Sequence, residues 1–175
     1  MHLILIDWEK AFDKVSQKGL FSALERMSIN PKLISMIREL YKNPRYKVEM
    51  DGYTSNWHTQ ESGIRQGCPL SPYLFLIIMT VFFHDIHQDE ALETELKENR
   101  IIGTLFDELL YADDTIIYSK DSKTVEKLLH KIEEEGEKYG MQLNQKKCEA
   151  LSIRGDKTVK YRNGKKYHHK TKPDI

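Results

Sequence analysis

The chain begins with an unbroken apolar run that ends in a carboxylate. Residues 2–6 read His-Leu-Ile-Leu-Ile, and Asp7 follows them directly. A short continuous run rich in Ile and Leu is typical of a central strand that is covered on both faces of a sheet. We therefore expect a buried strand with Asp7 at its end. A turn or helix-capping aspartate is the alternative interpretation of Asp7.

Two stretches that follow this strand place apolar residues at helical spacing. The first contains Leu20, Phe21, Leu24 and Met27, and the second contains Leu33, Ile34, Ile37, Leu40 and Tyr41. Spacings of three and four residues predict amphipathic helices. Asn30-Pro31 marks the start of the second helix, because proline is favoured at the first helical position.

The middle of the chain changes from alternating to continuously apolar. Residues 46–50 alternate apolar and charged side chains before Asp51-Gly52, and a second extended stretch runs through Trp57. This pattern predicts a β-hairpin. Residues 74–83 form the longest apolar run, which is too short to span a bilayer and is expected to be the buried core helix.

The last part of the chain predicts one more helix and one more strand. Apolar residues recur at helical spacing from Val125 to Tyr139, and Gly140 follows as a helix-ending glycine. The glutamates at 133–137 are expected to form a solvated face of this helix. Residues 147–153 are expected to form a strand. Strands interleaved with helices in this order predict an α+β fold, with helices packed on one face of an antiparallel sheet.

Two adjacent carboxylates interrupt the β-forming segment from Leu109 to Tyr118. Asp113 and Asp114 fall where this segment would turn, so they are expected at a hairpin tip. Neighbouring carboxylates repel each other and are costly to desolvate, which favours a compensating cation. Mg²⁺ is the natural candidate, since it prefers oxygen ligands and keeps positions open for phosphates. An ordinary β-turn is the alternative, because Asp is common in turns.

The position of the first strand bears on this choice. If it neighbours the hairpin, Asp7 can approach Asp113, and the two can hold a pair of divalent ions. Two such ions, about 4 Å apart, activate an attacking oxygen and stabilise a leaving oxygen in phosphoryl transfer.

Residues 62–72 form a polar loop that glycine and proline interrupt. Ser71 is expected to cap the following helix, with Pro72 at its first position. Gly63 and Gly67 permit close approaches or backbone angles that a Cβ would forbid. Arg65 and Gln66 could then contact a phosphate, a base edge or a sugar. A purely structural loop is the alternative.

Four motifs spread over most of the chain carry a family resemblance. They are Asp7-Trp-Glu-Lys-Ala-Phe-Asp-Lys-Val15, Gly63-Ile-Arg-Gln-Gly-Cys-Pro-Leu-Ser-Pro72, Tyr111-Ala-Asp-Asp114 and Gly140-Met-Gln-Leu-Asn-Gln-Lys-Lys-Cys148. In this order they resemble the palm domain of a reverse transcriptase, most closely the type encoded by non-LTR (LINE-like) retrotransposons. A group II intron reverse transcriptase is one alternative. A catalytically inactive palm remnant or RNA-binding scaffold is another, although such scaffolds typically lose a metal carboxylate.

The resemblance implies an RNA-directed DNA polymerase that extends a DNA primer with dNTPs on an RNA template. It implies two Mg²⁺ ions, for which Mn²⁺ can substitute. By the same resemblance, Asp7 and Asp113 are the principal metal ligands and Asp114 is the supporting carboxylate.

The resemblance also assigns roles to residues around these carboxylates. Phe12 matches the family's steric gate, whose ring lies where the 2′-hydroxyl of a ribonucleotide must go; a core aromatic is the alternative. Lys147 matches the lysine near the nucleotide's phosphates, where it would offset or protonate the leaving pyrophosphate; a solvated lysine is the alternative. The other residues implied in substrate binding are Arg65, Gln66, Gly67 and Tyr111.

Length and composition limit what this chain is expected to do alone. At 175 residues it can form one core but not a complete polymerase. We expect residues 1–153 to be a partial palm whose fingers and thumb belong to missing regions of the same polyprotein, so the isolated fragment should be inactive. Residues 154–175 are expected to be a basic tail of a kind that is often disordered, and we assign it no binding site.

Charge and cysteine content add further limits. The net charge is zero, from 27 basic and 27 acidic residues, whereas proteins that grip a duplex usually carry a basic excess. Cys68 and Cys148 lack the spacing of a zinc site, so both are expected to be reduced thiols. No signal peptide is apparent and no membrane partner is expected, while cytoplasm and nucleus both stay open as locations.

Overall fold

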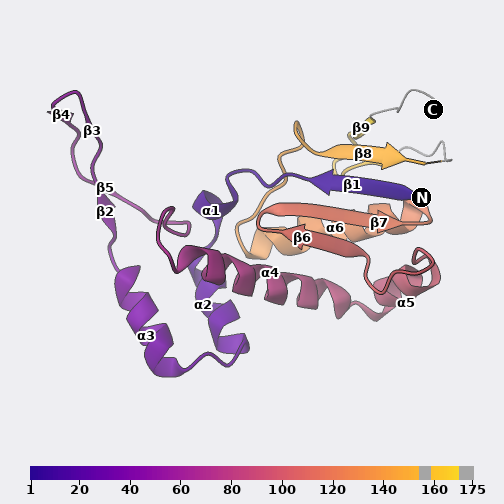
Figure 1. Ribbon diagram of the computed structural model, residues 1–175, viewed down its shortest axis with the longest axis horizontal. Helices are drawn as coiled ribbons and strands as arrows, with labels where there is room; N and C mark the ends of the chain where they lie inside the picture. Colours follow the sequence, from indigo (N-terminus) through magenta and orange to yellow (C-terminus); the bar gives the residue numbers. More distant parts are fainter. Residues whose placement is uncertain (154–158, 170–175) are drawn as a thin grey trace.

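A five-stranded sheet organises the chain, in the order β6-β7-β1-β8-β9 (Figure 1). The computed structural model describes residues 1–153 and 159–169. The strands are β1 (His2–Ile6), β6 (Glu108–Tyr111), β7 (Asp114–Ser119), β8 (Glu149–Ser152) and β9 (His168–His169). All neighbours pair antiparallel except β8 and β9, which pair parallel. The predicted α+β class is confirmed.

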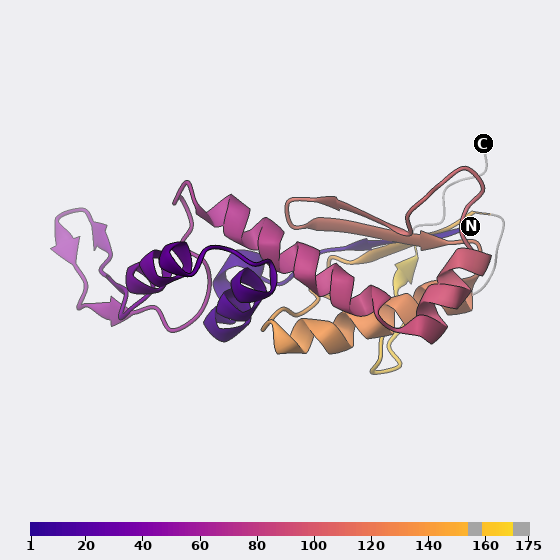
Figure 2. The ribbon, with the colours of Figure 1, turned by 90° about the horizontal axis from the view of Figure 1, so that it is seen from below.

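The helices of the described chain are α1 (Ala11–Lys14), α2 (Gln17–Arg26), α3 (Pro31–Leu40), α4 (Ser71–His87), α5 (Glu90–Glu98) and α6 (Ser122–Lys138). Of these, α4, α5 and α6 lie on one side of the five-stranded sheet, whereas α3 lies away from it (Figure 2). Helix α6 contacts β1 and β7 directly, and α4 packs against both α2 and α6. Because most side chains of α4 are buried, this helix forms the centre of the core, as predicted from its apolar run.

The start of α4 differs from the prediction. Ser71 is the first helical residue and Leu70 caps the helix without a side-chain hydrogen bond. The Ser71 hydroxyl instead donates to the carbonyl oxygen of Arg65, in the loop before the helix. The predicted capping role of Ser71 is therefore wrong, because the loop takes its hydroxyl. No helix in the described residues, α4 included, is long and apolar enough to cross a membrane.

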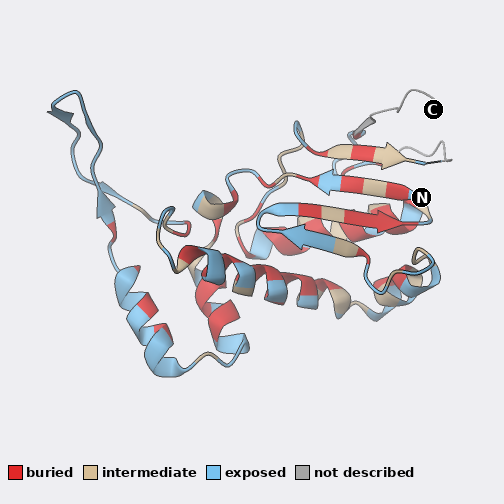
Figure 3. Ribbon diagram, viewed as in Figure 1, coloured by how far each residue is buried: buried red, intermediate tan, exposed pale blue. Residues whose placement is uncertain are grey.

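One face of the sheet is open, which agrees with the predicted fold class and departs from the prediction for β1 (Figure 3). Ile4 and Ile6 of β1 are buried against the helices, but Leu5, on the opposite face, is 40% exposed. Leu5 pairs with Ile116 of β7, which in turn pairs with Leu109 of β6. The expectation that β1 is covered on both faces is wrong, because the helices cover only one side. We call the uncovered side, which includes Leu5, Leu109 and Ile116, the open face.

A thin arm extends away from the sheet between α3 and α4 (Figure 1). It consists of two short antiparallel pairs, β2 (Arg45–Tyr46) with β5 (His58–Thr59) and β3 (Glu49–Met50) with β4 (Tyr53–Thr54). Asp51 and Gly52 form its turn, both with positive φ. The predicted β-hairpin is therefore confirmed.

Part of the segment expected to be a tail packs into the molecule. Val159, Tyr161 and Tyr167 are buried, and the two tyrosine rings stack with their centroids 3.8 Å apart. Residues 154–158 and 170–175, which include Lys170 and Lys172, lie outside the described residues. The described part of the segment thus contributes to the core.

The glutamate face of α6 is not uniformly solvated as predicted. Glu135 is only 3% exposed, and its carboxylate pairs with Lys131 at 3.3 Å and Lys138 at 2.6 Å. The prediction is wrong for Glu135 because these two lysines, four residues before and three residues after it, neutralise its charge where it is buried.

Candidate active site

Three carboxylates lie at the same end of the neighbouring strands β1 and β7. Strands β1 and β7 pair antiparallel with Ile6 opposite Thr115, so Asp7 and Asp114 follow as the next opposed positions. Asp113 occupies the turn between β6 and β7, beside Ala112 with φ 54°. Both aspartates of the hairpin are exposed, and Asp7 is partly exposed. The predicted neighbourhood of β1 and the hairpin is confirmed.

The donor set is compatible with a divalent cation. Among the described residues, the carboxylates of Asp113 and Asp114 have no hydrogen-bond or ion-pair partner. No three His, Cys, Asp or Glu side chains of the described chain come close enough together to hold a metal ion by themselves. Mg²⁺ is commonly bound by only one or two carboxylates, with waters and substrate phosphates completing its shell. The carboxylate oxygens of Asp7 with those of Asp113 or Asp114 fit that pattern.

Lys147 approaches the Asp7 carboxylate from the loop before β8. Its Nζ lies 4.0 Å from Oδ2 of Asp7, and its side chain is 70% exposed. An exposed pair at this distance contributes little stability. Its geometry nevertheless keeps an ammonium group beside Asp7 and open to solvent.

The backbone of Asp7 is held from below by two residues of that loop. The Asp7 N–H donates to Sγ of Cys148 at 3.4 Å, and the Asn144 N–H donates to the Asp7 carbonyl oxygen at 2.8 Å. Cys148 is fully buried, and this burial raises the pKa of its thiol. The sequence reasoning missed this contact, which depends on residues 141 positions apart.

Phe12 lies in α1, which begins four residues after Asp7. Its ring stacks on Phe75 of α4, with centroids 4.7 Å apart and planes 22° apart. Phe12 is partly buried and packs against the core. The ring is therefore fixed by packing while part of it stays accessible.

The glycine-rich loop docks onto α1. The Gly63 N–H donates to the Val15 carbonyl oxygen at 2.8 Å, and Nε2 of Gln66 donates to Oδ1 of Asp13 at 2.9 Å. A Cβ on Gly63 would lie 2.6 Å from the Asp13 carbonyl oxygen, so only glycine fits this approach. Gly67 has a φ of +80° in open space and serves the backbone conformation alone.

The side chain of Arg65 turns toward the end of α3. Its guanidinium donates to the Leu40 carbonyl oxygen at 2.6 Å and lies 5.8 Å from the centre of the Tyr41 ring. The structure thus gives Arg65 a role in fastening the loop to the end of α3.

Tyr111, paired with Asp114 at the end of β6, is 80% exposed.

The sequence-derived site residues therefore fall into three sets. At the strand ends lie Asp7, Tyr111, Asp113, Asp114 and Lys147. On and beside α1 lie Phe12, Gln66 and Gly67. Arg65 alone is engaged with α3.

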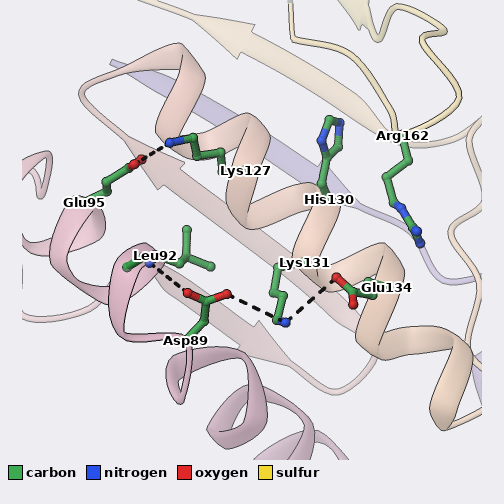
Figure 4. A pocket seen from close by; sticks show the side chains of 9 residues that line it. Asp89, Leu92, Glu95, Lys127, His130, Lys131, Glu134 and Arg162 are labelled. Carbon is green, nitrogen blue, oxygen red and sulfur yellow. Dashed lines mark hydrogen bonds and ion pairs between the residues drawn. The ribbon is translucent and has the colours of Figure 1, made fainter.

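A separate hollow lies between α5 and α6 (Figure 4). Lys131 pairs there with Asp89 at 3.8 Å and Glu134 at 3.9 Å, and Lys127 pairs with Glu95. These charges compensate one another, and none of the residues at the strand ends lines the hollow. We assign it no ligand.

Solved structures that superpose on this chain define the class of its fold. The structure of apo telomerase from Candida tropicalis superposes with a TM-score of 0.67 over 87% of this chain and 29% of that chain, at 16% identity. Telomerase from Candida albicans, in complex with the TWJ fragment of telomeric RNA, gives a TM-score of 0.57 over 92% and 28%, at 17% identity. The chain has a polymerase palm-like fold.

The sequence comparison identifies the family. The family described as reverse transcriptase (RNA-dependent DNA polymerase) matches residues 1–168, and the chain belongs to it. The Pol polyprotein from the type-1 retrotransposable element R2 of Nasonia vitripennis is 26% identical over 87% of this chain and 14% of its own length. The RNA-directed DNA polymerase from the mobile element jockey of Drosophila melanogaster is 26% identical over 82% and 15%.

These relatives confirm the predicted type of domain. They belong to non-LTR retrotransposons, and the comparisons favour neither a group II intron enzyme nor a scaffold. The chain spans about a seventh of the length of these relatives.

Proposed function

We propose that this chain supplies the catalytic palm of an RNA-directed DNA polymerase. In the proposed reaction, a primer 3′-hydroxyl attacks the α-phosphate of a dNTP and releases pyrophosphate. The observation that carries this proposal is the placement of Asp7 opposite the Asp113-Asp114 hairpin at the end of adjoining strands. Divalent Mg²⁺, or Mn²⁺ in its place, would activate the attacking oxygen and stabilise the leaving one.

The chain's own residues have distinct parts in this proposal. Asp7, Asp113 and Asp114 provide the carboxylate oxygens that hold the metal ions. Lys147, exposed beside Asp7, offsets negative charge on the leaving pyrophosphate. Phe12 excludes the 2′-hydroxyl of a ribonucleotide.

The loop before α4 forms a further side of the nucleotide pocket in this proposal. Gln66 and Gly67 supply it from the loop docked on Asp13, where they face the incoming nucleotide and the template base. Tyr111, exposed beside Asp114, adds a contact at the strand ends. Arg65 contributes indirectly, since it fastens this loop to α3.

An RNA template, a DNA primer and dNTPs are the proposed substrates. Two observations support the template: the relative from jockey is named an RNA-directed DNA polymerase, and the similar Candida albicans telomerase is bound to RNA. The much greater length of the relatives supports fingers and thumb regions within the same polyprotein.

Primer extension on an RNA template tests the proposal in the full-length polyprotein. We expect Asp7→Asn and Asp113→Asn each to lower extension at least about 100-fold, since they remove a charged metal ligand without changing its size. Asp51→Asn is the matched control, because Asp51 is an exposed turn aspartate on the arm. Circular dichroism should show all three variants folded. Full activity of Asp113→Asn would refute the metal role.

A further inference from the structure

The pairing between β1 and β8 is interrupted beside Asp7. The ladder runs from His2 opposite Ser152 to Leu5 opposite Glu149, and pairing resumes only between Trp8 and Leu143. Between these two contacts β1 advances three residues and the other strand six. The extra residues form a turn, closed by the Lys147 N–H on the Asn144 carbonyl oxygen at 2.9 Å. The Asp7 carbonyl oxygen still accepts the Asn144 N–H at 2.8 Å, but the Asp7 N–H lies where a regular ladder partner is missing.

Cys148 takes the place of that partner. Its Sγ accepts the Asp7 N–H at 3.4 Å and lies 3.6 Å from the Asp7 carbonyl oxygen, to which the thiol donates. The side chain is fully buried, so water cannot substitute for it. A backbone N–H that is removed from water needs a partner, and here the thiol is that partner.

The carboxylate of Asp7 has little else to orient it. Among the described residues, its side-chain contact is the exposed ammonium of Lys147, 4.0 Å away. The direction of the Asp7 side chain is therefore set mainly by its backbone. We infer that Cys148 is a positioning residue, which fixes the Asp7 carboxylate for metal binding without touching substrate. This inference rests on the proposed function, in which Asp7 is a metal ligand.

A second layer supports the same turn. The hydroxyl of Tyr161 donates to the carbonyl oxygen of Gln145 at 3.2 Å, within the turn that separates Asn144 from Cys148. Tyr161 is 1% exposed and stacks on Tyr167. The segment after β8 therefore backs the turn that carries both Lys147 and Cys148.

Nuclear magnetic resonance of the labelled 175-residue chain tests the inference with Mn²⁺ as the probe. Two quantities are measured: hydrogen exchange of the Asp7 amide, and the Mn²⁺ concentration that half-broadens the Asp7, Asp113 and Asp114 signals. For Cys148→Ala we expect about tenfold faster exchange at Asp7, the equivalent of one lost hydrogen bond. We also expect the Mn²⁺ concentration that half-broadens these signals, here called the Mn²⁺ requirement, to rise several-fold.

Further variants separate positioning from general destabilisation. Cys148→Ser should recover part of both effects, because a hydroxyl also accepts and donates. Tyr161→Phe, which removes only the hydroxyl, should have a smaller effect in the same direction. Val125→Ala is the control, since Val125 is equally buried on α6. It should lower the unfolding temperature and leave the Mn²⁺ requirement unchanged.

The outcomes distinguish the inference from the proposed function. Mn²⁺ binding that does not respond to Cys148→Ala would overturn the inference alone, even if exchange became faster. Absence of Mn²⁺ broadening in the unaltered chain would refute the metal site itself, and the inference would fall with it.

Discussion

The ring of Phe12 is held in place by packing against Phe75. Its stacking on Phe75 restricts rotation of the ring, and a side chain that excludes a substrate group works only if its own position is fixed. The core-aromatic and gate interpretations are therefore compatible in this fold. The packing on one side of the ring is what makes the other side rigid.

Replacement of Phe12 separates these two roles. We expect Phe12→Ala to raise ribonucleotide incorporation relative to dNTPs by about tenfold or more, measured by competitive primer extension in the full-length polyprotein. Stability should also fall, by roughly 3 kcal/mol, because the stack on Phe75 is lost. Phe21→Ala is the control, since Phe21 is a buried aromatic of α2. It should lower stability without changing sugar selectivity, and unchanged selectivity in Phe12→Ala would remove the gate role.

The sequence was sufficient to locate the carboxylates but not their surroundings. Asp7 and Asp113 could be placed because each follows or interrupts a strand pattern. The contact of Cys148 could not, because it depends on an irregular turn and on pairing across 141 residues. Arg65 looked free for phosphate, but the unpaired carbonyls at the end of α3 offered a nearer partner.

The hairpin that carries Asp113 is fastened at its base by a histidine. His87, at the end of α4, lies 3.1 Å from the Glu108 carboxylate of β6 and 2.7 Å from that of Glu93 in α5. The hydrogen bond to Glu108, together with Glu93, raises the pKa of His87 to about 9. One imidazolium thus joins three elements of the fold.

This junction should make stability depend on pH. Because the pKa of His87 is raised, its contribution is fully present below about pH 6.5 and is lost as the pH rises through 9. Urea unfolding at pH 6 and pH 10 measures this. Between these pH values, the free energy of unfolding of the unaltered chain should fall by roughly 1–2 kcal/mol more than that of His87→Gln. His84→Gln, an exposed histidine of the same helix, should retain the pH dependence. Equal losses in the unaltered chain and His87→Gln would contradict the role of His87.

The hydrophobic pattern predicted the long helices and missed the short ones, α1 and α5. Helices α2, α3 and α6 were found from apolar spacing, and α4 was found from its continuous apolar run. Helix α5 was missed because only Leu92 and Leu96 of its nine residues are buried. A usable signal was present in Asp89, whose carboxylate accepts the Leu92 N–H at 3.1 Å as an N-cap.

The segment after β8 extends the packed unit beyond residue 153. Its buried side chains, Val159, Tyr161 and Tyr167, lie within a basic stretch, and the prediction of a tail considered only the charge of that stretch. A basic composition describes the exposed positions of such a segment and says little of the ones between them.

Removal of this segment should destabilise the chain. The free energy of unfolding of a chain that ends at Ile153 should be at least about 3 kcal/mol lower than that of the 175-residue chain, because buried aromatic contacts are lost. Urea unfolding measures this difference. Tyr161→Ala combined with Tyr167→Ala, at full length, should reproduce most of the loss, and Lys165→Ala, an exposed position between them, should not. Equal stability of the two chain lengths would contradict the packing role.

The strand order has a consequence for how the molecule is made. Strand β1 is synthesised before its partners β7 and β8, which follow more than a hundred residues later, as the 107-residue separation of Trp8 from its bonded Thr115 illustrates. Synthesis proceeds from the N-terminus, and pairings of such long range form slowly. Until β7 and β8 are synthesised, β1 is an unpaired apolar strand. A nascent chain interrupted before residue 113 therefore lacks both carboxylates of the hairpin and exposes an aggregation-prone edge.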